Sequence, residues 1–200
     1  YTSLAGTRAP VLDIGCGNGA LLYALRDRIN SGIGVDESGG IIERARIKNA
    51  ENKHVSFQKI NGPVLPFPDN SFDAVTSLMS FRYLDWDPLL AEIKRVMRPG
   101  GKFLIIDMVT VPVAVSEYPR LLGDKLRTMK NQKANARFDA ALQKLVSHPD
   151  WKKMLEYNPI RSEHEMKWYL ESRFPGHKME ILNMAWHSRI VAFDSGPVES

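Results

Sequence analysis

The fold of this chain is decided close to its start, by the stretch Val11-Leu12-Asp13-Ile14-Gly15-Cys16-Gly17-Asn18-Gly19-Ala20. An apolar run typical of a buried strand is followed by glycines at three alternate positions. From Gly19 to about Arg28 the apolar residues recur at helical spacing, which predicts a helix. Glycine allows close approach of a ligand to the backbone, and a helix start presents unpaired N–H groups. The stretch therefore predicts a strand, a tight turn and a helix that together hold a nucleotide-like ligand.

The spacing of the glycines distinguishes between classes of nucleotide-binding turn. The dinucleotide fingerprint is G-x-G-x-x-G, whereas Gly15, Gly17 and Gly19 are one residue tighter. Together with Asp13 and Cys16 they give the pattern D-x-G-C-G-x-G, which resembles motif I of the class I S-adenosylmethionine (SAM) methyltransferases. A nicotinamide-dependent oxidoreductase would share the fold, but its glycine spacing differs and the sequence has no Tyr-x-x-x-Lys arrangement.

A second predicted strand, residues 31–35, ends in the acidic pair Asp36 and Glu37. A carboxylate that closes the second strand of such a unit binds ribose hydroxyls, about 20 residues after the glycines. Asp36 stands at this position and is the predicted ribose ligand, with Glu37 beside it in the cofactor site. The alternative is that Asp36 caps the predicted helix 39–50, a role that Ser38 can also fill.

A third predicted strand, residues 55–60, leads to Asn61-Gly62 and then to Leu65-Pro66-Phe67-Pro68-Asp69-Asn70-Ser71-Phe72-Asp73. This segment resembles the L-P-F-x-D-x-S-F-D segment of many small-molecule methyltransferases. In that family an acidic residue four positions before the leucine often accepts from the adenine amino group. Asn61 stands there instead, and its amide oxygen accepts without the assistance of a charge. A simple Asn-Gly turn is the alternative for this pair.

The predicted fourth strand, residues 74–78, opens on Met79-Ser80-Phe81-Arg82-Tyr83. Ligands of open α/β sheets lie outside the carboxyl ends of the strands, so this segment is expected to face the methyl donor or the acceptor. Asp87 is predicted to cap the next helix, with Pro88 at its first position. Residues 103–106 are continuously apolar, as in a parallel strand covered on both faces. The string from Glu92 to Ile106 again resembles the methyltransferases.

Residues 113–158 read as helical pieces: one opened by Pro119, a second over 135–147, and a third that begins at Pro149. This segment holds nine Lys and Arg against five Asp and Glu, while the rest of the chain has eighteen of each. The net charge of +4 therefore resides here. Related enzymes use this region as a lid over the acceptor, and we predict the same role, against the alternative of a solvated helical face.

The C-terminal part is predicted to hold one helix and one hairpin. Ser162 and Glu165 form a capping-box pattern at the start of a helix that runs to about Phe174. His164 on this helix is a candidate acid–base group, or else a surface histidine without a fixed role. Residues 178–184 and 189–193 read as two strands with a short connection, which indicates an antiparallel pair.

Composition sets further bounds. Two hundred residues, 44% of them hydrophobic, are typical of one soluble globular domain. Cys16 is the single cysteine, so an internal disulfide is excluded and the reducing cytoplasm is favoured. We interpret Cys16 as a small residue that fills the turn rather than as a nucleophile. No apolar run is long enough to span a membrane. The pI near 9.2 suggests nucleic acid only weakly, because no N-P-P-Y motif is present. Since only ten residues precede the first strand, we expect that an N-terminal helix is missing.

The resemblance implies a doubly wound α/β fold in one domain, residues 1–200, with a mostly parallel seven-stranded sheet, a C-terminal antiparallel hairpin and helices on both faces. It also implies SAM as cofactor, a small-molecule acceptor and no metal. By resemblance, Asp13 and the turn 15–19 would bind the methionine portion of SAM, Asp36 the ribose, and Asn61-Gly62 the adenine. Leu78 and Met79 would flank the methionine end.

The catalytic residues are not identified by the sequence, and the candidates are Arg82, Tyr83 and His164. Many relatives have histidines where Arg82 and Tyr83 stand, and an arginine is a poor base. We therefore predict that Arg82 anchors an anionic group of the acceptor. The alternative is a surface ion pair of Arg82 with Asp85 or Asp87. A SAM-binding regulatory subunit without catalysis would share every feature up to Val109 and remains a second hypothesis.

Overall fold

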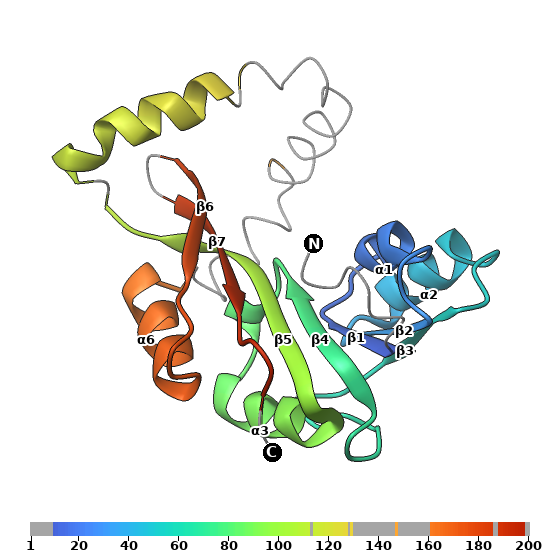
Figure 1. The fold of residues 1–200 in the computed structure, drawn as a ribbon. Helices are drawn as coiled ribbons and strands as arrows, with labels where there is room; N and C mark the ends of the chain where they lie inside the picture. The colour runs from blue at the N-terminus through green and yellow to red at the C-terminus, as the bar shows by residue number, and fades with distance from the viewer. Residues whose placement is uncertain are drawn as a thin grey trace.

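The computed structural model describes residues 10–112, 114–127, 129, 147, 161–185 and 188–198. They form a seven-stranded sheet in the order β3-β2-β1-β4-β5-β7-β6, in which only β7 runs antiparallel to its neighbours (Figure 1). The strands are β1 (Pro10–Ile14), β2 (Ser31–Asp36), β3 (Val55–Lys59), β4 (Phe72–Leu78), β5 (Met97–Thr110), β6 (Glu180–Met184) and β7 (Ser188–Asp194). The predicted doubly wound sheet with its closing hairpin is confirmed.

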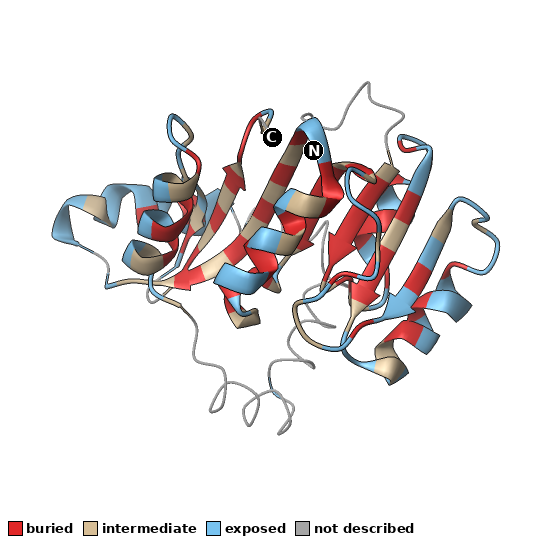
Figure 2. Cartoon of the chain, turned by 90° about the horizontal axis from the view of Figure 1, so that it is seen from below, coloured by how far each residue is buried: buried red, intermediate tan, exposed pale blue. Residues whose placement is uncertain are grey.

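Helices cover both faces of this sheet. They are α1 (Ala20–Leu25), α2 (Gly39–Lys48), α3 (Trp86–Val96) and α6 (Glu163–Arg173), with 3₁₀ turns η2 (Phe81–Tyr83) and η3 (Val115–Glu117). One hydrophobic cluster joins α3 and α6 to the strands, and a second joins α1 and α2 to the opposite face. Figure 2 shows the resulting pattern, in which the strands are largely buried and the outer helix faces are exposed. Alternation of side chains along each strand divides the core into these two layers.

The central strand β5 is covered less evenly than the sequence predicts. Phe103 and Ile105 are fully buried in the layer of α3 and α6. Leu104 and Ile106 point to the other face, are only partly buried, and line a cavity. The predicted cover on both faces is therefore complete only on the side of α3 and α6 within the described part of the chain, because α1 and α2 lie over β1, β2 and β3 and Leu104 packs only partly against their cluster.

The start of α3 also differs from the prediction. The helix begins at Trp86 and its N-cap is Asp85, whose carbonyl accepts from the N–H of Leu89. Asp87 does not cap it, because its carboxylate accepts from the Tyr169 hydroxyl at 2.9 Å and from Arg173 at 2.8 Å. These bonds lower the pKa of Asp87, the Tyr169 hydroxyl having the larger effect. A residue predicted to fix one helix therefore joins two.

The chain leaves the sheet after β5 and returns beside the point of departure. The N–H of Thr110 donates to the carbonyl of Arg161 at 3.0 Å, and Thr110 forms an isolated parallel bridge with Ser162. Ser162 caps α6 as predicted, since its hydroxyl accepts from the N–H of Glu165 at 3.1 Å. Of the predicted helical segment 113–158, the structure describes η3 and a helix over residues 118–127; the predicted helices from 135 and from 149 lie outside the described residues.

Candidate active site

The glycine turn joins β1 to α1 and has positive φ at each of its glycines. A Cβ at Gly15 would lie 2.3 Å from the Ser80 hydroxyl oxygen, so this position packs directly against the loop after β4. A Cβ at Gly17 would have no atom within 4 Å, so this glycine faces open space. The two glycines therefore have different roles. Gly15 allows the glycine turn to pack against the loop after β4, and Gly17 leaves the backbone of the turn accessible to a ligand.

Asp36, at the end of β2, reaches across to this turn. One carboxylate oxygen accepts from the N–H of Gly17 at 3.1 Å, and the other accepts from the N–H of Ser38 at 2.9 Å. The N-cap of α2 is Ser38, so Asp36 does not occupy the capping position that was its alternative role. The structure thus brings the predicted ribose carboxylate into contact with the glycine turn, at the carboxyl ends of adjacent parallel strands.

Asp13 lies beneath the turn and is buried in the sheet. Its carboxylate accepts from the Thr76 hydroxyl at 2.9 Å, across the β1–β4 pair in which the two residues are register partners. Burial raises the pKa of Asp13 from 3.8 to about 7, and the nearby Asp36 carboxylate adds to the shift, while the Thr76 bond opposes it. The site therefore holds two carboxyl groups close together under the turn, and a cationic ligand above it would favour the ionised form of Asp13.

Glu37 connects the site to the loop after β3, a contact that the sequence did not predict. Its carboxylate accepts from the N–H of Gly62 at 3.2 Å. Asn61, the predicted adenine ligand, is exposed beside this bond. The predicted ribose and adenine segments are thus brought together at one edge of the sheet, and Glu37 holds the second of them in place.

Met79 follows β4 with φ of 60°, a left-handed conformation that is rare for a side chain of this size. Its N–H donates to the carbonyl of Ile106 at 2.7 Å, which holds the strained backbone. The next residue, Ser80, donates its hydroxyl to the carbonyl of Ile14 at 3.0 Å. Backbone strain of this kind is concentrated at functional sites, and here it turns the chain sharply at the end of the strand, beside the glycine turn.

Arg82 does not have the role that the sequence predicts. Its guanidinium side chain is 1% exposed and pairs with the buried Asp107 of β5, whose carboxylate also accepts from the backbone N–H of Arg82 at 2.8 Å. Burial raises the pKa of Asp107, and the Arg82 charge opposes that shift. The predicted anchor for an anionic acceptor is therefore wrong, because the charge is already neutralised inside the protein. The alternative pairing with Asp85 or Asp87 is not observed either.

The other catalytic candidates lie apart from each other. The ring of Tyr83 sits 4.3 Å from the guanidinium carbon of Arg82, and its hydroxyl is buried with no hydrogen-bond partner among the described residues. His164 is exposed near the start of α6, a helix that lies on the far side of β5 from β1 (Figure 1). Tyr83 and Arg82 both follow β4 and both have a buried polar atom without a described partner, the Tyr83 hydroxyl and the Arg82 Nε, but the charge of Arg82 is paired with Asp107.

Cys16 fills space inside the turn. A Cβ at Gly34 would lie 2.8 Å from its sulfur, which shows how closely the thiol packs against β2. Burial raises the pKa of the thiol, and the carboxylates of Asp13 and Asp36 raise it further. A thiol that resists ionisation is a poor nucleophile, in agreement with the space-filling interpretation. Among the described residues no group of His, Cys, Asp and Glu side chains is arranged to hold a metal ion.

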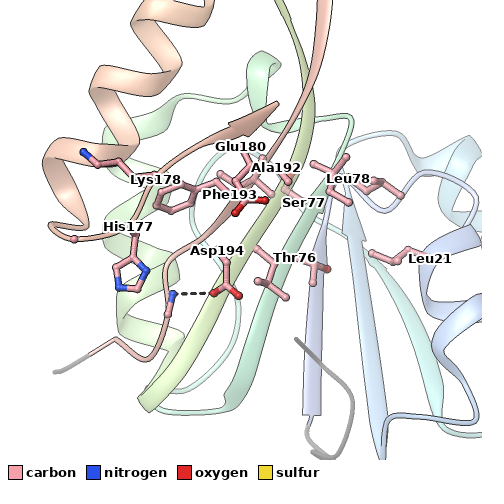
Figure 3. Close-up of a pocket in the computed structure, with 15 residues that line it drawn as sticks. Leu21, Thr76, Ser77, Leu78, His177, Lys178, Glu180, Ala192, Phe193 and Asp194 are labelled. Carbon is pink, nitrogen blue, oxygen red and sulfur yellow. Dashed lines mark hydrogen bonds between the residues drawn. The ribbon is translucent and has the colours of Figure 1, made fainter. Parts of the chain in front are cut away.

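A cavity of about 540 Å³ lies over β4, β5 and β7, on the face of the sheet that α1 covers further along (Figure 3). Its floor is apolar and includes Leu78, Leu104 and Ile106, whereas His177 and Glu180 line its rim. Of the predicted site residues only Leu78 lines this cavity. The cavity therefore adjoins the predicted cofactor site without containing it, since Asp36 and the glycine turn lie at the strand ends.

Known proteins share this arrangement. Residues 12–105 match the family model described as a methyltransferase domain. A SAM-dependent methyltransferase from Aquifex aeolicus superposes with a TM-score of 0.60 over 94% of this chain and 82% of that one, at 20% identity, which shows the same fold. The fold of this chain is that of the class I methyltransferases. The match to the family model begins at β1 and ends inside β5, so the likeness in sequence lies in the half of the chain that builds the glycine turn.

The proteins that this chain resembles carry different names. The chain is 35% identical over 115 residues to a demethylmenaquinone methyltransferase from Thermus thermophilus, covering 54% of this chain and 52% of that protein. It is also 30% identical to the [4+2]-cyclase SpnF, with a TM-score of 0.50 over 56% of this chain and 42% of that one. The chain thus spans about half the length of the curated relative that it matches.

Proposed function

We propose that this protein binds SAM at the glycine turn and transfers its methyl group to a small-molecule acceptor. The observation that carries the proposal is the Asp36 carboxylate, bonded to the N–H of Gly17 over a turn whose central glycine faces open space. The hydroxyls of a ribose at this point can donate hydrogen bonds to the Asp36 carboxylate, while the cationic sulfonium and ammonium groups of SAM lie toward the buried Asp13. Charge complementarity with these two carboxylates favours SAM over an anionic dinucleotide.

The protein's part in the reaction is mainly alignment. SAM supplies an activated methyl group, so transfer requires an acceptor atom held in line behind that methyl and water kept away; such positioning supplies up to about 7–11 kcal/mol. The segment from Met79 to Tyr83 stands at the end of β4, where the acceptor would approach. We assign the Tyr83 hydroxyl to the acceptor side, because it has no described partner, whereas the Arg82 charge is paired with Asp107 and His164 is exposed on α6.

The segment 113–158 supports the same proposal as a cover for the acceptor. It departs and returns at Thr110 and Ser162, on the edge of the sheet where the parallel strands end. The predicted lid role stays a prediction, to be tested by replacing residues 130–158 with a short Gly/Ser linker. Loss of methyl transfer with SAM binding retained is expected; loss of both would indicate a structural role.

A SAM-binding protein without methyl transfer is the second candidate. It is favoured by the likeness to a cyclase at 30% identity, because a shared cofactor fold hosts different chemistries. Transfer of a labelled methyl group from SAM to pooled small metabolites distinguishes the two. Binding of SAM with no labelled product under any condition would favour the second.

Calorimetry tests the binding site directly. We expect micromolar-class binding of SAM and far weaker binding of NAD. Asp36→Ala should weaken SAM binding by about 1.5–3 kcal/mol, the value of a hydrogen bond to a charged group. Asp27→Ala is the matched control, since its carboxylate is exposed on the turn after α1. Unchanged SAM affinity in Asp36→Ala, or tighter binding of NAD than of SAM, would refute the assignment.

A further inference from the structure

The Tyr83 hydroxyl is a polar group that the fold buries without satisfying. Tyr83 ends η2, shortly after β4, and its hydroxyl oxygen is buried although the residue as a whole is only partly buried. None of the residues that the structure describes forms a hydrogen bond with this oxygen. A buried hydroxyl without a partner has lost its bonds to water and gained none in return. Such a group in a folded protein therefore requires an explanation.

The tyrosine ring is held in place by the side chain that precedes it. The guanidinium carbon of Arg82 lies 4.3 Å from the centre of the Tyr83 ring. Arg82 is itself fixed by Asp107, whose carboxylate accepts from the guanidinium group and, at 2.8 Å, from the backbone N–H of Arg82. Turning the tyrosine so that its hydroxyl reaches water would break the contact with the guanidinium group. Arg82 and Asp107 therefore hold the ring, and we call these two residues the tyrosine support.

The tyrosine support is anchored on the central strand of the sheet. β4 pairs with β5 as far as Leu78 and Ile106, so Asp107 is the first residue of β5 beyond that pairing. Its buried carboxylate also accepts from the N–H of Met108 at 2.7 Å. The bonds of Asp107 to Arg82 thus take over where the strand pairing ends, and they tie η2 to a rigid part of the sheet.

Stability alone does not account for an ion pair at this place. The side chains of Arg82 and Asp107 are 1% and 0% exposed, so both charges have been removed from water. In such a pair the loss of hydration offsets the attraction, and apolar side chains of similar size are often as stable. The Arg82 Nε is buried without a described partner as well. An arrangement that adds little stability and leaves two polar atoms unpaired is expected where a side chain is held for function.

We propose that the Tyr83 hydroxyl forms a hydrogen bond with a polar atom of the methyl acceptor, and that Arg82 and Asp107 are positioning residues that hold the tyrosine for this contact. The inference rests on the proposed function, because it needs an acceptor that approaches the end of β4. A phenolic hydroxyl both donates and accepts, so it can bind an oxygen or a nitrogen of the acceptor. The buried hydroxyl is then satisfied only when the acceptor is bound.

Tyr83→Phe tests the contact, because it removes the hydroxyl and keeps a ring over Arg82. If the hydroxyl has no partner in the free protein, the melting temperature should stay unchanged or rise by about 2–4 °C. SAM affinity, measured by calorimetry, should be retained. Transfer of a labelled methyl group from SAM to pooled small metabolites should fall by about tenfold, since the bond to the acceptor is lost.

Arg82→Met/Asp107→Leu tests the tyrosine support. The variant removes both charges and keeps apolar bulk, so its melting temperature should lie within a few degrees of that of the wild type. Methyl transfer should fall as in Tyr83→Phe, and the triple variant should lose no more, because all three residues act through one hydroxyl.

An NMR signal reports the position of the ring without any need for methyl transfer. In protein with isotope-labelled tyrosine rings, the signal that is absent from Tyr83→Phe belongs to Tyr83, and it should shift in Arg82→Met/Asp107→Leu. Arg98→Met/Asp73→Leu is the matched control, because Arg98 and Asp73 join the same two strands near their other end at 3.1 Å. The control should change neither this signal nor methyl transfer.

Three results would overturn the inference alone. A lower melting temperature of Tyr83→Phe would mean that the hydroxyl has a partner inside the protein. Equal methyl transfer by Tyr83→Phe and the wild type would mean that the acceptor does not bind the hydroxyl. An unchanged Tyr83 signal in Arg82→Met/Asp107→Leu would mean that the two charges do not position the ring. A wild type that binds SAM and transfers no methyl group would instead refute the proposed function, and the acceptor contact with it.

Discussion

Asp13 should make the stability of this domain depend on pH in a direction opposite to that of most carboxylates. The carboxyl group is buried under the glycine turn, and burial is the main reason why its pKa rises from 3.8 to about 7. In the unfolded chain the group returns to its ordinary value. The folded protein therefore holds the proton more tightly than the unfolded chain does.

The size of the effect follows from these two values. The pKa rises from 3.8 to about 7, a change of roughly three pH units. Each unit is equivalent to about 1.36 kcal/mol, so an ionised Asp13 destabilises the folded state by roughly 4 kcal/mol. Below pH 3.8 the group is protonated in both states and costs nothing. The cost grows as the pH rises from about 4 to about 7 and is constant above that.

Urea unfolding of the wild type and of Asp13→Asn measures this cost. The amide removes the charge but keeps an oxygen that can accept from Thr76. The wild type should lose roughly 2–3 kcal/mol of unfolding free energy relative to the variant between about pH 5 and about pH 8. Asp27→Asn, at an exposed carboxylate, controls for the loss of one acidic group. A difference between wild type and Asp13→Asn that stays constant over this range would refute the reasoning.

Three further predictions concern charges that the structure places inside the protein. If the cationic groups of SAM approach Asp13, binding near pH 6.5 should release a proton, so the calorimetric enthalpy should vary with buffer in the wild type and less in Asp13→Asn. Asp107→Ala should cost about 3–5 kcal/mol of unfolding free energy, because it leaves Arg82 buried and unpaired, and Arg82→Met/Asp107→Leu should recover part of that loss in urea unfolding. Arg189→Met should cost a similar amount, measured in the same way, because the buried Arg189 pairs with Glu163 and, at 2.7 Å, with Glu117.

The sequence predicted the sheet well because its signals are local. The glycine turn, the apolar strands and the turn residues between them each specify their own short segment, so the strands β1 to β4 follow within a few residues, whereas β5 extends well beyond the predicted residues 103–106. The pairing of β6 with β7 follows from their short connection. What the pattern could not supply is the partner of a side chain that lies far away in sequence.

Arg82 and Asp87 show this limit. Arg82 stands at a position that faces the acceptor in the sequence pattern, but its partner Asp107 is 25 residues away on the next strand. Asp87 precedes a proline in a helix-start pattern, yet its partners are Tyr169 and Arg173 on α6. The Asp36–Gly17 bond was within reach of prediction, because β1 and β2 are adjacent parallel strands whose ends must coincide.

The meeting of Thr110 with Arg161 and Ser162 has a consequence for how such a domain can diversify. The two ends of the intervening segment are fixed side by side, and Arg189 pairs with Glu117 near one end and with Glu163 near the other. The structure of the sheet is therefore independent of the length of that segment. Doubling the length of a closed loop costs only about 0.6 kcal/mol. We therefore expect that the segment between Thr110 and Ser162 can be replaced by one of another length while the half of the molecule that carries the glycine turn is left unchanged.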